Sequence, residues 1–144
     1  MSTIIPDHQV TSAKISEILS AAFYEVGDIS SNDGSDVFSI SEGDLHVPQY
    51  VLVDPEEKNV KLFILFPPPK NGWSRERAIS IANKVNSDVR GDVCMFVDDD
   101  SGIVVCKLIP GKKGLNPHHI IEGVRNLNKL FNAVFEMELV NYYK

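Results

Sequence analysis

The stretch that decides the fold is VCMFVDDDSGIVVCKLIPGKKGLNPHHIIEGVRNLNKLFNAVF, residues 93–135. Its first part holds two apolar runs rich in β-branched residues, 93–97 and 103–109, on either side of the acidic segment 98–102. Two such runs joined by a short turn that contains Asp and Gly predict a β-hairpin. The hairpin makes an antiparallel sheet the expected framework of the fold.

A long helix is predicted soon after this hairpin. Asn116 supplies a side-chain oxygen for the helix N-cap, and Pro117 fits the first helical position, where its missing N–H costs nothing. The apolar residues that follow are spaced as on one face of a helix. They are Ile120, Ile121, Val124, Leu127, Phe131, Val134 and Phe135. We therefore expect a helix from Asn116 to about Phe135.

Three strands are predicted before the hairpin, at residues 37–40, 45–53 and 60–66. Pro48 favours an edge or a bulge for the second strand, because proline cannot donate a ladder hydrogen bond. Residues 55–59 have turn chemistry, and the prolines at 67–69 end the third strand.

Two more helices complete the predicted order. The first covers residues 10–26, with Thr11 or Ser12 as N-cap and Gly27 as the C-terminal stop. The second runs from Ser74 to about residue 86. Its apolar face comprises Ala78, Ile81, Ala82 and Val85. The expected order is α-β-β-β-α-β-β-α, an α+β fold with helices packed on an antiparallel sheet.

The composition is that of one ordinary globular domain. The chain has 144 residues, of which 43% are hydrophobic and 24% charged, and this excludes disorder of the whole chain. We expect residues 1–9 to be a flexible N-terminus and residues 10–144 to form a single domain. Two cysteines are too few for a disulfide-stapled secreted domain, and we find no membrane span or signal-peptide pattern. We therefore expect a cytoplasmic protein with reduced thiols.

Charge is unevenly distributed along the chain. The net charge of -6 argues against binding to nucleic acid or to an anionic membrane. Residues 1–60 hold eleven acidic and two basic side chains, a net of -9, whereas residues 61–144 hold nine and twelve, a net of +3. These halves either complement each other, within a monomer or across a dimer, or present separate solvated surfaces.

Candidate catalytic and metal sites fail their spacing tests. Asp98, Asp99 and Asp100 lack the EF-hand spacing, so we interpret them as turn residues. The histidines, His8, His46, His118 and His119, have no partner at i, i+4 on a predicted helix. The sequence contains neither a nucleophile elbow nor a phosphate-binding loop. We therefore expect no enzyme activity, no metal and no cofactor.

The two cysteines are predicted to face each other. If Val97 pairs with Ile103 in the hairpin, Cys94 lies opposite Cys106. A disulfide between adjacent strands strains its preferred dihedral angle, and the cytosol is reducing. We therefore expect two small buried hydrophobic residues rather than a redox pair.

Residues 60–66 and 93–97 are apolar on both strand faces. Such strands are either covered twice by the chain's own helices or present a patch to another chain. In the second case, the expected partner or dimer surface comprises Leu62, Ile64, Phe66, Trp73, Ala78 and Ile81. Trp73 has an alternative role as a packing anchor, because an apolar residue just before the helix cap staples onto N4, here Ala78.

The segment GWSRER, residues 72–77, resembles the Trp-Asn-Arg-Glu-Arg-type start of the second helix in YbjN-like proteins, which are described as bacterial sensory transduction regulators. Two strands around an acidic turn at 93–109, followed by Gly114-Leu115-Asn116 at the start of a long helix, agree with the same family. The resemblance extends over about residues 37–135. Ser74 replaces the usual Asn, and both residues are good N-caps.

This resemblance implies a type III secretion chaperone-like fold without catalytic residues. It implies a non-enzymatic interaction module that binds protein partners. The alternative is a type III secretion chaperone that holds an extended effector segment on its sheet. Secretion chaperones are small, acidic and dimeric, so we also expect a homodimer.

Overall fold

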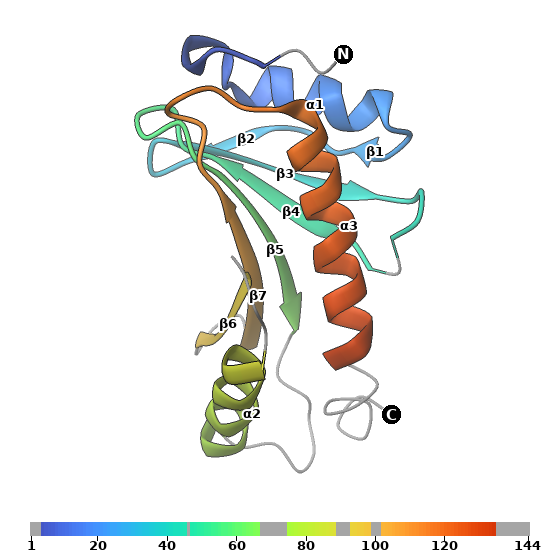
Figure 1. Ribbon diagram of the computed structural model, residues 1–144, viewed down its shortest axis with the longest axis vertical. Coiled ribbons are helices and arrows are strands. Elements are labelled where there is room, and N and C mark those ends of the chain that lie inside the picture. Colours follow the sequence, from blue (N-terminus) through green and yellow to red (C-terminus); the bar gives the residue numbers. More distant parts are fainter. Residues whose placement is uncertain (1–3, 46, 67–74, 89–92, 99–101, 135–144) are drawn as a thin grey trace.

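The computed structural model describes residues 4–45, 47–66, 75–88, 93–98 and 102–134 (Figure 1). These residues form an α+β fold with an antiparallel sheet, as predicted. The helices are α1 (Ser12–Ala21), α2 (Arg75–Asp88) and α3 (Pro117–Val134), preceded by a 3-10 helix at Asp7–Gln9. The strands are β1 (Glu25–Val26), β2 (Ser30–Asn32), β3 (Ser35–Ser41), β4 (Gln49–Val53), β5 (Val60–Phe66), β6 (Val93–Asp98) and β7 (Gly102–Ile109).

The seven strands hydrogen-bond in the order β1-β3-β4-β5-β7-β6, and β2 also pairs with β3. Each of these pairs is antiparallel. Strands β5 and β6 run parallel to each other, because β7 lies between them and is antiparallel to both. Helix α2 thus connects a split β-α-β unit, which the linear order of elements did not reveal.

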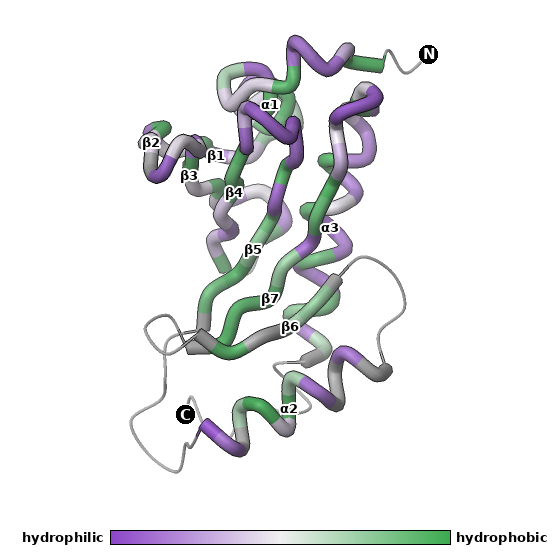
Figure 2. The backbone as a smooth tube through the Cα atoms, turned by 90° about the vertical axis from the view of Figure 1, so that its left-hand side faces the viewer, coloured by the Kyte–Doolittle hydropathy of each residue, from purple (hydrophilic) through white to green (hydrophobic). Residues whose placement is uncertain are grey.

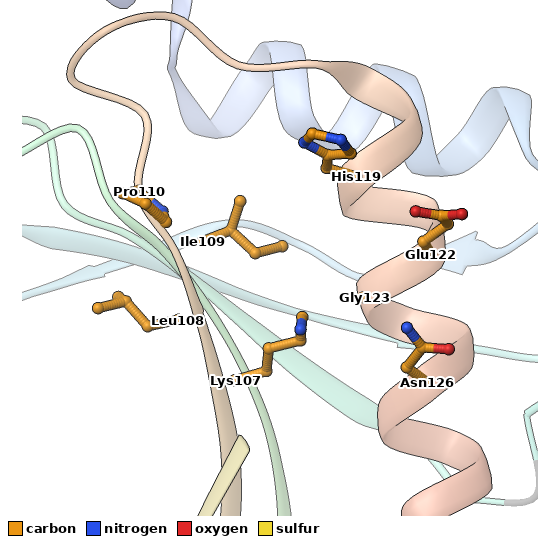
Figure 3. Close-up of a pocket in the computed structure, with 8 residues that line it drawn as sticks. All are labelled: Lys107, Leu108, Ile109, Pro110, His119, Glu122, Gly123 and Asn126. Atoms are coloured by element: carbon orange, nitrogen blue, oxygen red, sulfur yellow. The ribbon is translucent and has the colours of Figure 1, made fainter. Parts of the chain in front are cut away.

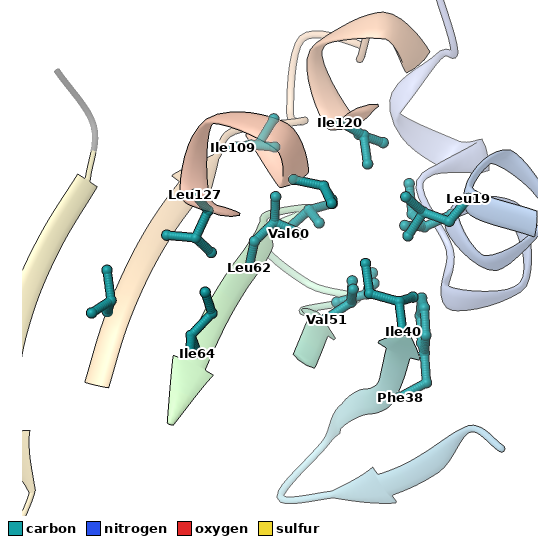
Figure 4. Close-up of a cluster of buried hydrophobic side chains, with 14 of the residues drawn as sticks. Leu19, Phe38, Ile40, Val51, Val60, Leu62, Ile64, Ile109, Ile120 and Leu127 are labelled. Carbon is teal, nitrogen blue, oxygen red and sulfur yellow. The ribbon is translucent and has the colours of Figure 1, made fainter. Parts of the chain in front are cut away.

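Helices α1 and α3 pack on one side of the sheet, which we call the covered face (Figures 1 and 4). Side chains alternate between the two faces along a strand, so every second residue points to this side. The buried residues of the covered face are Phe38, Ile40, Val51, Val53, Val60, Leu62, Ile64, Met95, Ile103, Val105 and Ile109. Together with Ile15 and Leu19 of α1, and Ile120, Val124 and Leu127 of α3, they form the hydrophobic core.

Helix α3 approaches the sheet most closely at Gly123. A Cβ atom there would lie 3.0 Å from the Cδ1 atoms of both Ile109 and Leu62, so the glycine lets the helix backbone sit directly above β5 and β7. The helix is also held by a buried polar contact, in which Gln49 Nε2 donates to the Val124 carbonyl at 2.9 Å. Neither contact is visible as a pattern in the sequence.

The predicted N-caps of α1 and α3 are confirmed. Thr11 Oγ1 accepts a hydrogen bond from the Lys14 amide at 3.2 Å. Asn116 Oδ1 accepts one from the His118 amide at 3.0 Å. These side chains satisfy amide groups that have no partner inside the helix, as the cap rules require.

The predicted end of α1 at Gly27 is wrong, because the helix stops at Ala21. The Tyr24 amide bonds to the Leu19 carbonyl, and the Phe23 amide to the Ser20 carbonyl, which is the hydrogen-bond pattern of a Schellman motif. Phe23 occupies the left-handed position of this motif, with φ 73°, where glycine is usual. The chain then forms β1 and β2 within residues 25–32, although the predicted helix extended to residue 26 and no strand was predicted before residue 37.

Within the N-terminal residues 1–9, which were predicted to be flexible, Ile5 contacts the rest of the domain. Ile5 is buried and exchanges two backbone hydrogen bonds with Leu115, at 2.7 and 2.8 Å. The segment before α3 therefore serves as a docking strand for the N-terminal residues. An isolated bridge of this kind has no sequence signature.

Strand β6 is protected along its outer edge by α2. The Asn86 side chain accepts from the Met95 amide and donates to the Met95 carbonyl, both at 2.7 Å. The asparagine amide therefore takes the place of a neighbouring strand at this residue. An occupied edge position cannot pair with another chain.

Candidate functional site

The opposite side of the sheet, which we call the open face, is the candidate functional site. Its apolar residues lie outside the core cluster that α1 and α3 cover, although Val104 of β7 is itself buried, with 5% of its surface exposed. Strand registers place its residues in rows that cross β3, β4, β5 and β7. Its described apolar side chains are Val37, Tyr50, Leu52, Phe63, Leu65, Cys94, Val104, Cys106 and Leu108.

The centre of the open face is aromatic. Tyr50 and Phe63 lie opposite each other on β4 and β5, and their rings stack with centroids 5.5 Å apart. Both side chains are half-buried, whereas Leu108 at the β7 end is 39% exposed. Figure 2 shows how apolar β5 and β7 are where they run side by side. An apolar sheet face that the described helices leave uncovered is typical of surfaces that contact another molecule.

The predicted surface residues Leu62 and Ile64 lie on the other side of β5. They are only 0% and 2% exposed, because they point into the core beneath α3. Ala78 is also completely buried, and Ile81 of the same helix is partly buried against the core. These four side chains pack within the chain, so their assignment to a partner surface is corrected. The side chain of Phe66 and the whole of Trp73 fall outside the described residues, as does the expected stapling of Trp73 onto α2.

The outward-facing residues of β5 are the chain neighbours of the residues predicted for the surface. Phe63 and Leu65 alternate with Leu62 and Ile64 along β5, and they point to the open face. The sequence signal for this orientation is Lys61, which is exposed and lies on the same side of the strand as Phe63 and Leu65, since the three residues follow one another at intervals of two. A charged residue marks the solvent side of a strand, so its parity identifies the outward face.

The two cysteines are also on the open face. Cys94 pairs directly with Cys106 across β6 and β7, so the predicted register is confirmed. Cys94 is exposed and Cys106 half-buried, and both thiols are free. The expectation that both are buried is therefore wrong for Cys94, which lies on a side of the sheet that has no described helix over it. Burial, followed by the nearby Cys94, raises the pKa of Cys106 to about 11.

A shallow hollow of about 270 Å³ lies between β7 and the first half of α3 (Figure 3). Its polar lining combines Lys107, His119, Glu122 and Asn126, with Gly123 among the lining residues. The charges are mixed, and the imidazole of His118, not of His119, lies 3.3 Å from Glu122.

A polar cluster ties the β3–β4 loop to the rest of the domain. Tyr24 Oη donates to Asp44 Oδ1 at 2.8 Å, and Arg125 Nε lies 3.7 Å from Asp44 Oδ2. The buried amide of Asn128 donates to the Asp44 carbonyl at 3.0 Å. Burial, followed by the hydrogen bond to Asp44, raises the pKa of Tyr24 to about 12. The cluster is a set of mutually satisfied groups that fixes the loop.

A second carboxylate is held at the other end of β3. Asp36 accepts hydrogen bonds from Ser12 Oγ at 2.6 Å and from Ser31 Oγ at 2.7 Å. These hydroxyl groups, with Ser12 the stronger cause, lower the pKa of Asp36. The arrangement connects α1, β2 and β3.

No group of three or more possible metal ligands occurs among the described residues. Asp99 and Asp100 of the predicted turn, and His46, lie outside them. His8 and His119 are exposed on the 3-10 helix and on α3, respectively.

Comparisons of the chain with family models, with curated proteins and with solved structures gave no match. None of the described helices has the length and apolar character needed to cross a lipid bilayer.

Proposed function

We propose that this protein is a non-enzymatic interaction module that binds protein partners through the open face of its sheet. The observation that carries the proposal is the contrast between a face packed by α1 and α3 and an opposite face with stacked, half-buried aromatic rings. Aromatic residues bury a large area at a small cost in conformational entropy, which suits them to protein contacts. The resemblance to YbjN-like regulators supports the same class of function, and a cytoplasmic location belongs to the proposal.

The first partner to test is a second copy of the chain. Two open faces brought together by a two-fold axis would bury the same apolar rows twice. Across β3, β4, β5 and β7 the open face carries one charged residue, Lys61, and Glu25 of β1 shares its side, so hydrophobic burial would dominate the affinity. Salt should therefore weaken the dimer only modestly.

The chain offers a matched pair of variants for this test. Leu108 on the open face and Ile79 on α2 are both large, apolar and 39% exposed. Sedimentation velocity at micromolar concentration should show a dimer for the wild type and for Ile79→Ser, and a shift towards monomer for Leu108→Ser and Phe63→Ser. A wild-type mass near 16.0 kDa would contradict the dimer.

If the wild type is a monomer, the test moves to another protein. Wild type and Ile79→Ser should then retain, from a lysate of the native host, the same proteins that Phe63→Ser loses. Equal retention by all three baits would contradict binding through the open face. Circular dichroism and melting curves of each variant check that the loss does not come from unfolding.

The secretion chaperone remains the second candidate, and the same face supports it. Asn86 occupies the β6 edge at Met95, so an extended segment could not pair there as an added strand. It would instead have to lie across the rows of the open face and bind through side chains. A gene for a secreted effector beside this gene, and binding of a peptide from that effector lost in Phe63→Ser, would favour this candidate.

A further inference from the structure

We propose that Cys94 and Cys106 form a reversible dithiol–disulfide pair, a modification site on the open face. The inference rests on the geometry and exposure of the two thiols in the chain without a bound partner. Three features support it: the strand register that places the two cysteines opposite each other, the exposure of Cys94, and the greater burial of Cys106.

The register brings the two α-carbons to bridging distance. Met95, the next residue along β6, directs its amide and carbonyl outward to Asn86. Hydrogen-bonding direction alternates along a strand, so Cys94 directs its own backbone groups towards Cys106. Residues in such a hydrogen-bonded pair have α-carbons about 5.5 Å apart, within the range of roughly 4.4–6.8 Å that disulfides span.

The same register makes a bridge easy to reduce. A disulfide across adjacent strands cannot relax fully, because the strand ladder fixes both α-carbons. Disulfides that are strained or exposed are the more readily reduced and exchanged ones. A bridge at this position therefore suits reversible oxidation better than permanent stapling.

The two thiols differ in exposure, and this difference indicates which cysteine attacks first and which one closes the bridge. Cys94 is exposed and can reach a small disulfide in solution. Cys106 is half-buried, and its raised pKa of about 11 keeps it a protonated thiol at neutral pH. Cys94 is thus the attacking residue, and Cys106 resolves the intermediate.

The reaction is exchange with a low-molecular-weight disulfide, RSSR. The Cys94 thiolate attacks one sulfur of RSSR, which forms a Cys94–SR mixed disulfide and releases the other half as RS⁻. Cys106 then loses its proton and attacks the Cys94 sulfur, which forms the Cys94–Cys106 bond and releases the second RS⁻. Both released groups take up protons, so two cysteine thiols are oxidised while one RSSR is reduced to two RSH.

The test uses the full chain in buffers of oxidised and reduced glutathione, with acid quench, alkylation and intact-mass measurement. As the buffer becomes more oxidising, the wild type should change from a form with two alkylated thiols to a form with none, and no glutathione adduct should accumulate. An excess of reduced glutathione should restore the form with two alkylated thiols. Cys106→Ser should accumulate the mixed disulfide at Cys94. Cys94→Ser should react about tenfold more slowly, because its remaining thiol is half-buried and protonated.

Three outcomes would overturn the proposal. The first is a stable glutathione adduct on wild-type Cys94 without bridge formation. The second is a disulfide between two chains, seen as a doubled mass under non-reducing conditions. The third is a bridge that survives an excess of reduced glutathione, which would make it structural. Circular dichroism of both serine variants confirms that they fold.

Discussion

The covered and open faces of the sheet are made by the same strands, yet they differ in what surrounds them. On the covered face, Val51 and Leu62 are completely buried beneath the helices. On the open face, their chain neighbours Tyr50 and Phe63 keep part of their surface in solvent. Similar hydropathy therefore leads to a packed core on one side and to a partly solvent-exposed face on the other, and the positions of α1 and α3 determine which side is the core.

The largest expected effect is a difference between the two faces in the free energy of unfolding that is lost when a leucine is truncated. Leu62→Ala should lower the free energy of unfolding by about 3 kcal/mol, because it leaves a cavity under α3. Leu52→Ala on the open face should cost about 1 kcal/mol or less, because the side chain is only half-buried there. Urea denaturation of both variants measures the difference. Equal losses would show that the open face is also packed within the monomer.

The second expected effect is a loss of stability at the edge of β6, where Asn86 contacts Met95. Asn86→Ala removes both hydrogen bonds to Met95 and should cost about 1–2 kcal/mol. Asn83→Ala, one turn earlier on the same helix and exposed, controls for the change in helix propensity. If the two variants have the same denaturation midpoint, the amide does not hold the edge of β6.

A smaller effect has the opposite sign. Phe23 is 87% exposed and holds a left-handed backbone conformation, so the motif at the end of α1 is strained while the ring packs little. Phe23→Gly should stabilise the protein by about 1 kcal/mol, because glycine adopts this conformation without a Cβ clash. Phe23→Ala keeps the clash and should give no such gain. Thermal melting compares them, and a loss in both variants would mean that the ring contributes packing.

The smallest effect appears only at alkaline pH. The folded-state pKa of Tyr24 is raised to about 12, above its unfolded value near 10, so its contribution to stability is complete below pH 10 and disappears as the pH rises through 12. Tyr24→Phe should therefore flatten the decline in stability over this window. Chemical denaturation at a series of pH values gives the slopes.

Much of the fold was predictable because its signals are local. The Asn116–Pro117 cap, the β5 boundaries and the pairing of Cys94 with Cys106 all follow from short patterns. The Schellman motif at Phe23 was missed because its usual signal is a glycine. Strands β1 and β2 are too short for their alternation to be read.

The candidate site was predictable only in part. The apolar strand 60–66 was identified as two-faced, but which face remains open depends on where α1 and α3 pack. Lys61 is the local signal for the outward face, and Leu62 and Ile64 lie on the opposite side of the strand from it. The role of Asn86 at Met95 depends on the tertiary position of α2 and has no pattern along the chain.

The insertion of β7 between β5 and β6 also sets the order in which the chain can fold. The hairpins β3–β4, β4–β5 and β6–β7 close over short loops, whereas the β5–β7 pairing must wait for α2 and β6. The entropy of closing this longer loop makes the pairing late and slow. The parts that it joins largely coincide with the acidic residues 1–60 and the net-positive residues 61–144. Their docking is the expected rate-limiting step of folding, and added salt should slow it by screening their attraction.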